Sequence, residues 1–175
     1  MDIPEILGLV VSLIVILSMQ LKNVRHILVC QLLINGIGAL TYVLQDGFSG
    51  CGIYLVALVQ TVVYFILRVK KISAPTMLAA VFAVLFVLCS AVAYTGYADI
   101  ISAVAALSCA LGIAQNKPSN YRICMLLNGL IWMAYDITLG AYTMIISHAV
   151  TFLSAGIGIV RLDLKNGKEN KGDLS

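Results

Sequence analysis

Long apolar runs, separated by short polar or charged breaks, cover almost the whole chain. Each run is close to the ~20 residues that an α-helix needs to cross a hydrocarbon core of about 30 Å. The pattern predicts seven such helices, over residues 4–21, 26–45, 50–68, 75–95, 98–115, 121–138 and 142–161, followed by a polar tail over 162–175. The fourth and fifth runs are separated only around residues 94–99.

The composition excludes a soluble globular protein. Hydrophobic residues make up 61% of the 175 residues and charged residues 11%, against roughly 45–50% and 25% in soluble domains. With a mean hydropathy of +1.01, there is too little polar surface to face water, so most of the surface must face lipid. The five cysteines are scattered singly in apolar runs, which predicts small buried residues without disulfides or zinc.

The acidic N-terminus, Met1 to Glu5, lacks the basic region and cleavage site of a secretory signal. The first apolar run is therefore expected to stay in the mature protein.

The basic residues all fall on one side of the predicted membrane if the seven helices alternate in direction. The loops on this side and the tail hold the 11 Lys and Arg residues: Lys22, Arg25, Arg68, Lys70, Lys71, Lys117, Arg122, Arg161, Lys165, Lys168 and Lys171. The opposite side receives Asp2, Glu5, Asp46 and Asp99, with Asp136 close to the same surface. Because basic loops stay in the cytoplasm, the pattern predicts an outside N-terminus and a cytoplasmic C-terminus. Six helices would break this segregation.

An internal repeat relates the first three predicted helices to the last three. Matching residues are 93 positions apart: Asn35 and Asn128, Gly36 and Gly129, Tyr42 and Tyr135, Gly47 and Gly140, and Arg68 and Arg161. A unit of three helices repeated directly would be inverted in the membrane, and the single extra helix between the units corrects this. The two units are then parallel and related by an axis along the membrane normal.

The sequence thus predicts an all-α membrane protein with a 3+1+3 architecture. The first three-helix repeat covers residues 1–71, a linker helix 72–97, the second repeat 98–161 and a cytoplasmic polar tail 162–175.

This architecture with an outside N-terminus resembles the SWEET, semiSWEET and PQ-loop superfamily of small membrane transporters. The stretch from Gly38 to Arg68, and the spacing of Trp132, Gly140, Gly156 and Arg161, are similar to those of the bacterial YgjV-type inner-membrane protein family. The resemblance covers nearly the whole chain. It implies a multi-pass protein of the bacterial inner membrane that carries a small solute by alternating access.

One departure concerns the proline that would hinge a gate. The proline-glutamine pair of the PQ-loop group is absent, and Pro4, Pro75 and Pro118 lie at helix ends or in loops. The expected flexibility would then come from four glycines in the second and seventh predicted helices: Gly36, Gly38, Gly156 and Gly158.

Polar residues far from helix ends are the candidate binding residues, because they are costly in a bilayer. Asn128, Trp132 and Tyr135 share one face of the sixth predicted helix, and Asn35 and Tyr42 share the corresponding face of the second. If both faces turn inward, they offer amides, phenols and a stacking surface to a small polar solute. The alternative is that the asparagines are hydrogen-bonding contacts between helices, and the sequence favours neither.

Three further polar residues lie on the third, sixth and seventh predicted helices. Gln60 is a pocket candidate, because an amide facing lipid would be poorly solvated. His148 and Asp136 are candidates for proton coupling, although a solvated Asp136 and a neutral His148 bonded to a carbonyl are the favoured interpretation.

The sequence does not indicate an enzyme, a cofactor or a metal site. It lacks GxxxxGK[ST], HExxH and GxSxG motifs, and the basic tail is too short for nucleic-acid binding. The expected partners are the lipid bilayer and a small-molecule solute. The alternative is a non-transporting membrane receptor or assembly protein, and the sequence leaves open whether the chain is a monomer or a homo-oligomer.

Overall fold

The described part of the chain folds into a bundle of seven α-helices. The computed structural model describes residues 3–44, 48–92, 96–139 and 142–164. The helices are α1 (Ile3–Met19), α2 (Val24–Leu44), α3 (Phe48–Val69), α4 (Thr76–Val92), α5 (Tyr97–Ala114), α6 (Pro118–Leu139) and α7 (Tyr142–Gly158). A π-helical segment, η1 (Ile159–Leu164), continues α7. The seven predicted helices are confirmed, with ends that differ by a few residues.

Capping residues explain where α2 and α6 begin. The Asn23 carbonyl accepts from the Ile27 amide at 3.1 Å, and its side-chain Oδ1 accepts from the Arg25 amide at 2.9 Å, as an N-cap does. At α6, Pro118 occupies the first helical position, where its missing N–H costs nothing. Both helices therefore start earlier than the apolar pattern indicates. The expectation that Arg25 and Arg122 lie in loops is wrong, since each lies inside a helix.

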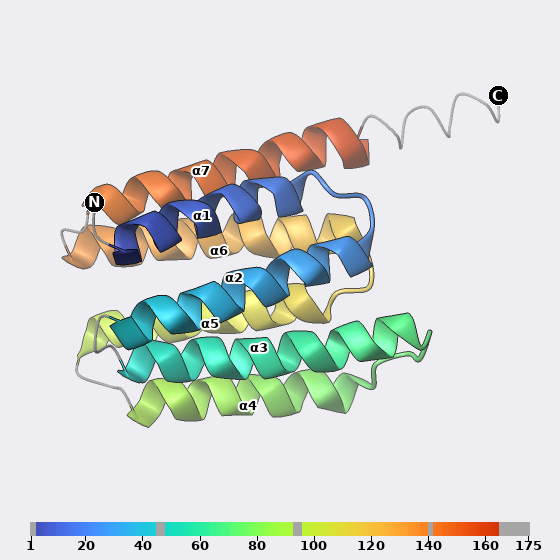
Figure 1. Cartoon of the computed structure of the whole chain (residues 1–175), viewed down its shortest axis with the longest axis horizontal. Coiled ribbons are helices and arrows are strands. Elements are labelled where there is room, and N and C mark those ends of the chain that lie inside the picture. Colours follow the sequence, from blue (N-terminus) through green and yellow to red (C-terminus); the bar gives the residue numbers. More distant parts are fainter. Residues whose placement is uncertain (1–2, 45–47, 93–95, 140–141, 165–175) are drawn as a thin grey trace.

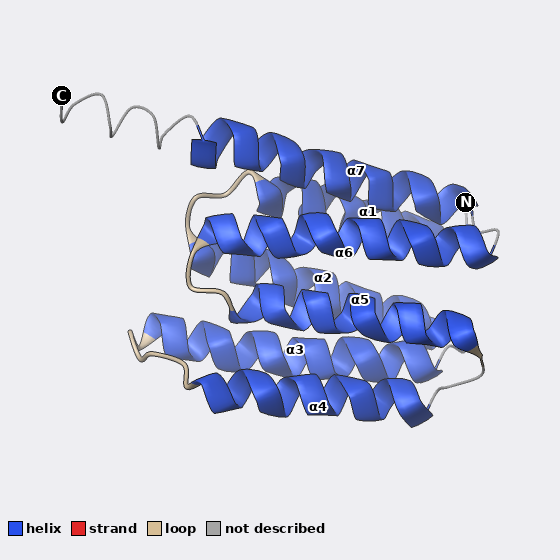
Figure 2. Ribbon diagram, turned by 180° about the vertical axis from the view of Figure 1, so that it is seen from behind, coloured by secondary structure: helices blue, strands red, loops and turns tan. Residues whose placement is uncertain are grey.

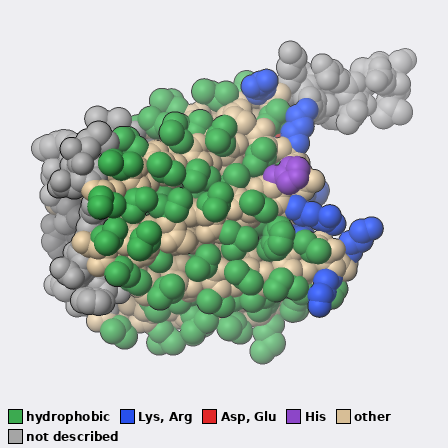
Figure 3. All heavy atoms as spheres, in the orientation of Figure 1, with side chains coloured by type: hydrophobic (Ala, Val, Ile, Leu, Met, Phe, Trp, Pro, Cys, Tyr) green, Lys and Arg blue, Asp and Glu red, His purple; other side chains and the backbone are tan. Residues whose placement is uncertain are grey.

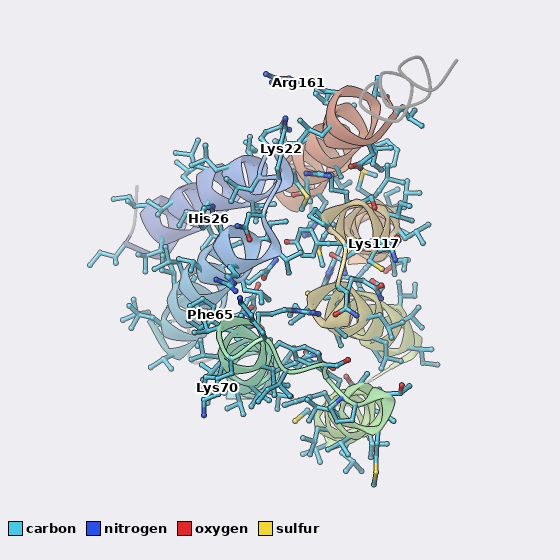
Figure 4. The ribbon with its side chains drawn as sticks, turned by 90° about the vertical axis from the view of Figure 1, so that its right-hand side faces the viewer. Lys22, His26, Phe65, Lys70, Lys117 and Arg161 are labelled. Carbon is cyan, nitrogen blue, oxygen red and sulfur yellow. The ribbon has the colours of Figure 1, made fainter. Side chains whose placement is uncertain are left out.

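The helices form two facing layers (Figures 1 and 2). In the first layer α2 packs between α1 and α3, and in the second α6 packs between α5 and α7. The layers meet at their edges, where α1 contacts α7 and α3 contacts α5, while α4 packs beside α3 and α5. Seen along the helices (Figure 4), α2 and α6 thus occupy the middle of opposite layers.

The surface is apolar around the middle of the bundle and basic at one end. Large hydrophobic side chains are exposed on every helix, and they cover the face seen in Figure 3, whereas its Lys and Arg side chains gather at the end where the described chain stops. We call this the basic end; it carries Lys22, Arg25, Arg68, Lys71 and Lys117. An apolar surface of this extent requires a nonaqueous environment.

Helix length and composition agree in part with the predicted spans. Among the described residues, Val24–Thr41 and Cys51–Val69 are long and apolar enough to cross a membrane, and Ile6–Met19, Thr76–Val92 and Ala103–Ala114 are shorter apolar helices.

The interior contains many polar and small residues. Polar side chains, including those of Ser18, Gln31, Gln60 and Thr61, are buried beside alanines. The five cysteines are free but half-buried rather than fully buried, so the expectation that they are small buried residues is wrong, although Cys109 packs against buried core residues.

Candidate functional site

The two asparagines of the repeat lie near the middle of α2 and α6 and are both buried. Asn35 is 3% exposed and Asn128 is 8% exposed. The Asn35 amide donates to Thr61 Oγ1 of α3 at 3.0 Å. The Asn128 amide donates to the Ala105 carbonyl of α5 at 2.7 Å and to Ser108 Oγ at 2.9 Å. Each asparagine therefore holds a neighbouring helix of its own layer.

These hydrogen bonds are of the kind that holds neighbouring helices together. Only the side-chain atoms of the asparagines that they do not use could bind a solute. A side-chain amide has two donor hydrogens and an oxygen acceptor. The bond from Asn35 to Thr61 occupies one of the donor hydrogens on its Nδ2. Among the described residues, no hydrogen bond joins Asn35 to Asn128, or either of them to Gln60.

Gln60 on α3 has an incomplete set of hydrogen bonds. Its side chain is fully buried, and its Nε2 donates to the Ala110 carbonyl of α5 at 2.9 Å. Its Oε1 has no partner within the described part of the chain. A buried acceptor without a donor costs about 1–3 kcal/mol, so a water molecule or a solute hydroxyl would be stabilised here. Gln60 also joins the two layers, because α3 and α5 belong to different layers.

An aromatic group links α6 to α7. The rings of Trp132 and Tyr135 are 5.4 Å apart and meet edge to face at 86°, as their shared helix face predicts. The ring of His148 stacks on Trp132, with centroids 5.5 Å apart and planes inclined by 12°. Sequence spacing did not reveal this contact, because it joins different helices. Gly129 permits the close approach: a Cβ there would lie 3.3 Å from the His148 carbonyl oxygen.

Two predicted site residues cannot be placed. Tyr42 and Asp136 belong to α2 and α6, but their side chains lie outside the described part of the structure.

A buried arginine at the basic end was not anticipated. Arg122 on α6 is 1% exposed. Its Nε donates to the Met19 carbonyl at 2.8 Å, its Nη2 to the Leu21 carbonyl at 2.5 Å and its Nη1 to Asp163 at 2.7 Å. The guanidinium therefore caps the end of α1 and forms an ion pair with η1. No spacing in the sequence indicated this burial, because the partners of Arg122 come from segments distant along the chain.

Gly158 makes room for this arginine. A Cβ at this position would lie 2.7 Å from the Met19 carbonyl oxygen and 3.0 Å from Arg122 Cδ. Gly38 likewise lies against the ring of Tyr54, which a Cβ would approach to 2.3 Å. These two glycines therefore allow close packing, and the expectation that they provide flexibility stays a prediction. A Cβ at Gly36 would meet nothing within 4 Å, and one at Gly156 would meet only Leu126 at 3.9 Å.

Several other hydrogen bonds join the layers in the half of the bundle that includes the basic end. Gln31 on α2 donates to the Tyr121 hydroxyl on α6, and both side chains are buried. Gln20 donates to the Ser154 carbonyl of α7 at 3.2 Å. Arg68 at the end of α3 donates to the Gln115 carbonyl after α5 at 3.2 Å. Together with Arg122, these contacts close the bundle at this end.

The comparisons with known proteins identify the family. The model of the family Imp-YgjV, described as bacterial inner membrane protein, matches residues 2–166. This match spans all seven helices and η1. The chain belongs to this family. No curated protein and no solved structure matches the chain. Membership of the Imp-YgjV family assigns the protein to the bacterial inner membrane, where lipid covers its exposed apolar side chains.

Proposed function

We propose that this Imp-YgjV protein is a small-solute transporter of the inner membrane. Two three-helix units, α1–α3 and α5–α7, would rock about a site between them, and α4 would serve as the linker. No ATP is required in this mechanism. The solute would be polar and of the size of a sugar, a nucleoside or a vitamin.

The proposed topology is seven crossings with the basic end in the cytoplasm. The helices contain 17 to 22 residues, within the ≈ 17–25 residues that span a bilayer. The grouping of Lys and Arg at one end follows the positive-inside rule. The N-terminus would then lie in the periplasm and the C-terminus in the cytoplasm.

The contacts between layers support a two-fold relation of the units. A rotation that carries α1 to α5, α2 to α6 and α3 to α7 converts the contact of α1 with α7 into that of α5 with α3. Both contacts are present. This arrangement and the 93-residue offset in the sequence favour the 3+1+3 repeat.

The observation that carries the proposal is the matched pair of buried asparagines. Asn35 and Asn128 lie at the middle of α2 and α6, the central helices of the two layers. A solute on the axis between the units would reach both of them at equal depth. Trp132 and Tyr135 would supply a stacking wall and Tyr42 a second phenol. The Oε1 of Gln60, which has no partner among the described residues, would supply an acceptor.

The contacts at the basic end would form the inner gate. Alternating access requires that one end be closed while the other is open. Arg122, Gln31 and Tyr121 join the layers or the helix ends there, so this conformation would be closed to the cytoplasm. Release of a solute to the cytoplasm would require these bonds to break.

Proton coupling is a further part of the proposal. The ring of His148 stacks on Trp132, which belongs to the proposed stacking wall, so a change in the charge of His148 would alter that wall. Asp136 is the second candidate. The test is the variant His148→Gln, in which uptake should lose its pH dependence while solute exchange persists. Unchanged pH dependence would assign His148 a structural role.

A screen of ligands tests the binding site. The detergent-purified protein is heated with sugars, nucleosides, vitamins and amino acids, because a ligand of the folded state raises the Tm. With a compound found in this way, Asn128→Ala should bind about tenfold more weakly, the effect of losing one hydrogen bond of about 1–2 kcal/mol. Asn120→Ala, at an exposed position on the same helix, is the matched control.

The same variants separate binding from helix packing. If Asn35→Ala and Asn128→Ala both lowered the Tm while the folded protein bound the compound normally, the asparagines would be packing contacts. The alternative function, a receptor or an assembly protein that does not transport, predicts binding without movement of solute across a membrane.

A further inference from the structure

A cavity of about 540 Å³ opens at the basic end, and neither Asn35 nor Asn128 lines it. Its walls come from the α1–α2 connection, the α3–α4 connection and the α5–α6 connection, so both layers contribute. The lining includes four basic residues: Lys22, Arg25, Arg68 and Lys71. Figure 4 looks onto this end of the bundle.

Positive charge is concentrated in the lining of the cavity. Among the residues that the structure describes, no acidic residue contributes to this lining. Asp163, the acidic residue whose side chain the structure describes at this end, is paired with Arg122 instead. Four like charges around one cavity repel one another, and a bound anion would remove this repulsion.

The backbone adds to this positive field. Val24 and Pro118, the first residues of α2 and α6, both line the cavity. A helix N-terminus carries about half a positive charge, although at α2 the Arg25 amide is already bonded to Asn23 Oδ1. The Arg68 guanidinium is held at the wall by its bond to the Gln115 carbonyl. The site is thus partly organised before any ligand arrives.

Lys71 occupies a backbone position that favours glycine. Its φ is 56°, its amide donates to the Arg68 carbonyl at 3.3 Å, and the Ile72 amide donates to the Leu67 carbonyl at 2.9 Å. These bonds form a Schellman motif, in which glycine is the usual residue at this position. A lysine there is strained relative to glycine, yet Lys71 is one of the residues that line the cavity.

We propose that this cavity is a binding site for a phosphoryl group. Phosphate oxygens accept several hydrogen bonds at once from Arg and Lys and from helix N-termini. The group would belong to the headgroup of an anionic lipid or to a soluble phosphorylated compound. By contacting connections of both layers, it would also hold the basic end of the bundle closed. The proposal is independent of transport.

The test is the stabilisation of the full chain in a neutral detergent. Inorganic phosphate is added at constant ionic strength, with chloride as the reference, and phosphatidylglycerol is added in mixed micelles, with phosphatidylcholine as the reference. The Tm of the wild type should rise with at least one of the two phosphoryl probes. A rise with phosphatidylglycerol alone identifies a lipid site, and a rise with inorganic phosphate identifies a site open to soluble compounds.

Two variants that each remove one positive charge distinguish binding in the cavity from general attraction of anions to the basic surface. Lys71→Gly should keep or raise the Tm without ligand, because glycine relieves the strain, and should bind the active probe about fivefold more weakly. Lys70→Gly is the matched control, since Lys70 is exposed, lies outside the cavity lining and points away from the bundle in Figure 4. Equal weakening in both variants, or no rise in Tm with either probe, would overturn the proposal.

Discussion

Replacing Arg122 by methionine should destabilise the protein more than any other loss of a basic side chain at this end. The variant keeps an apolar stem but leaves the Met19 and Leu21 carbonyls and Asp163 without their shared donor. Breaking a buried ion pair costs about 3–5 kcal/mol. Asp163 is 22% exposed, so water would solvate it in part, and we expect a loss near the lower limit, about 3 kcal/mol.

The assay measures the free energy of unfolding in detergent micelles by denaturant titration. Asp163→Asn should cost less, about 1 kcal/mol, because a neutral acceptor remains for the guanidinium. Arg161→Met is the control: Arg161 is exposed, and a surface substitution of this kind stays within about 0.5 kcal/mol. An Arg122→Met variant as stable as this control would refute the argument that the guanidinium joins α1, α6 and η1.

Three other predictions follow from the packing and the charge pattern. Gly158→Ala should lower stability by about 1–3 kcal/mol through overpacking, whereas Gly36→Ala, where a Cβ meets nothing within 4 Å, should be neutral or slightly stabilising by thermal unfolding. Tyr121→Phe should cost about 1–2 kcal/mol, because it leaves the buried Gln31 amide without its acceptor; an unchanged Tm would contradict this. A C-terminal fluorescent-protein fusion should be bright and an alkaline phosphatase fusion inactive, and the reverse result would invert the topology.

The helices were predictable from the sequence, because apolar runs between charged breaks carry a strong signal over this length. Their ends were less so. Asn23 and Pro118 start α2 and α6 within segments that are polar, and hydropathy alone places such residues in loops. Local capping, rather than apolar content, fixes these boundaries.

The side-chain partners were only partly predictable. The contact of Trp132 with Tyr135 follows from helical periodicity, which also predicts a shared face for Asn128. The stack of His148 on Trp132 and the bonds of Arg122 join helices distant in the sequence, and no spacing rule specifies which faces meet. A charge count assigned Arg122 to a side of the membrane but carried no information about its burial.

Uptake of a labelled solute into proteoliposomes tests the central claim most directly, once the ligand screen has supplied a compound. The transporter account predicts that the wild type moves the compound across the membrane, that Asn128→Ala does so more weakly at limiting concentration, and that Asn120→Ala matches the wild type. Binding of the compound by a correctly folded protein, with no uptake and no exchange in either direction, would contradict the account and favour a receptor.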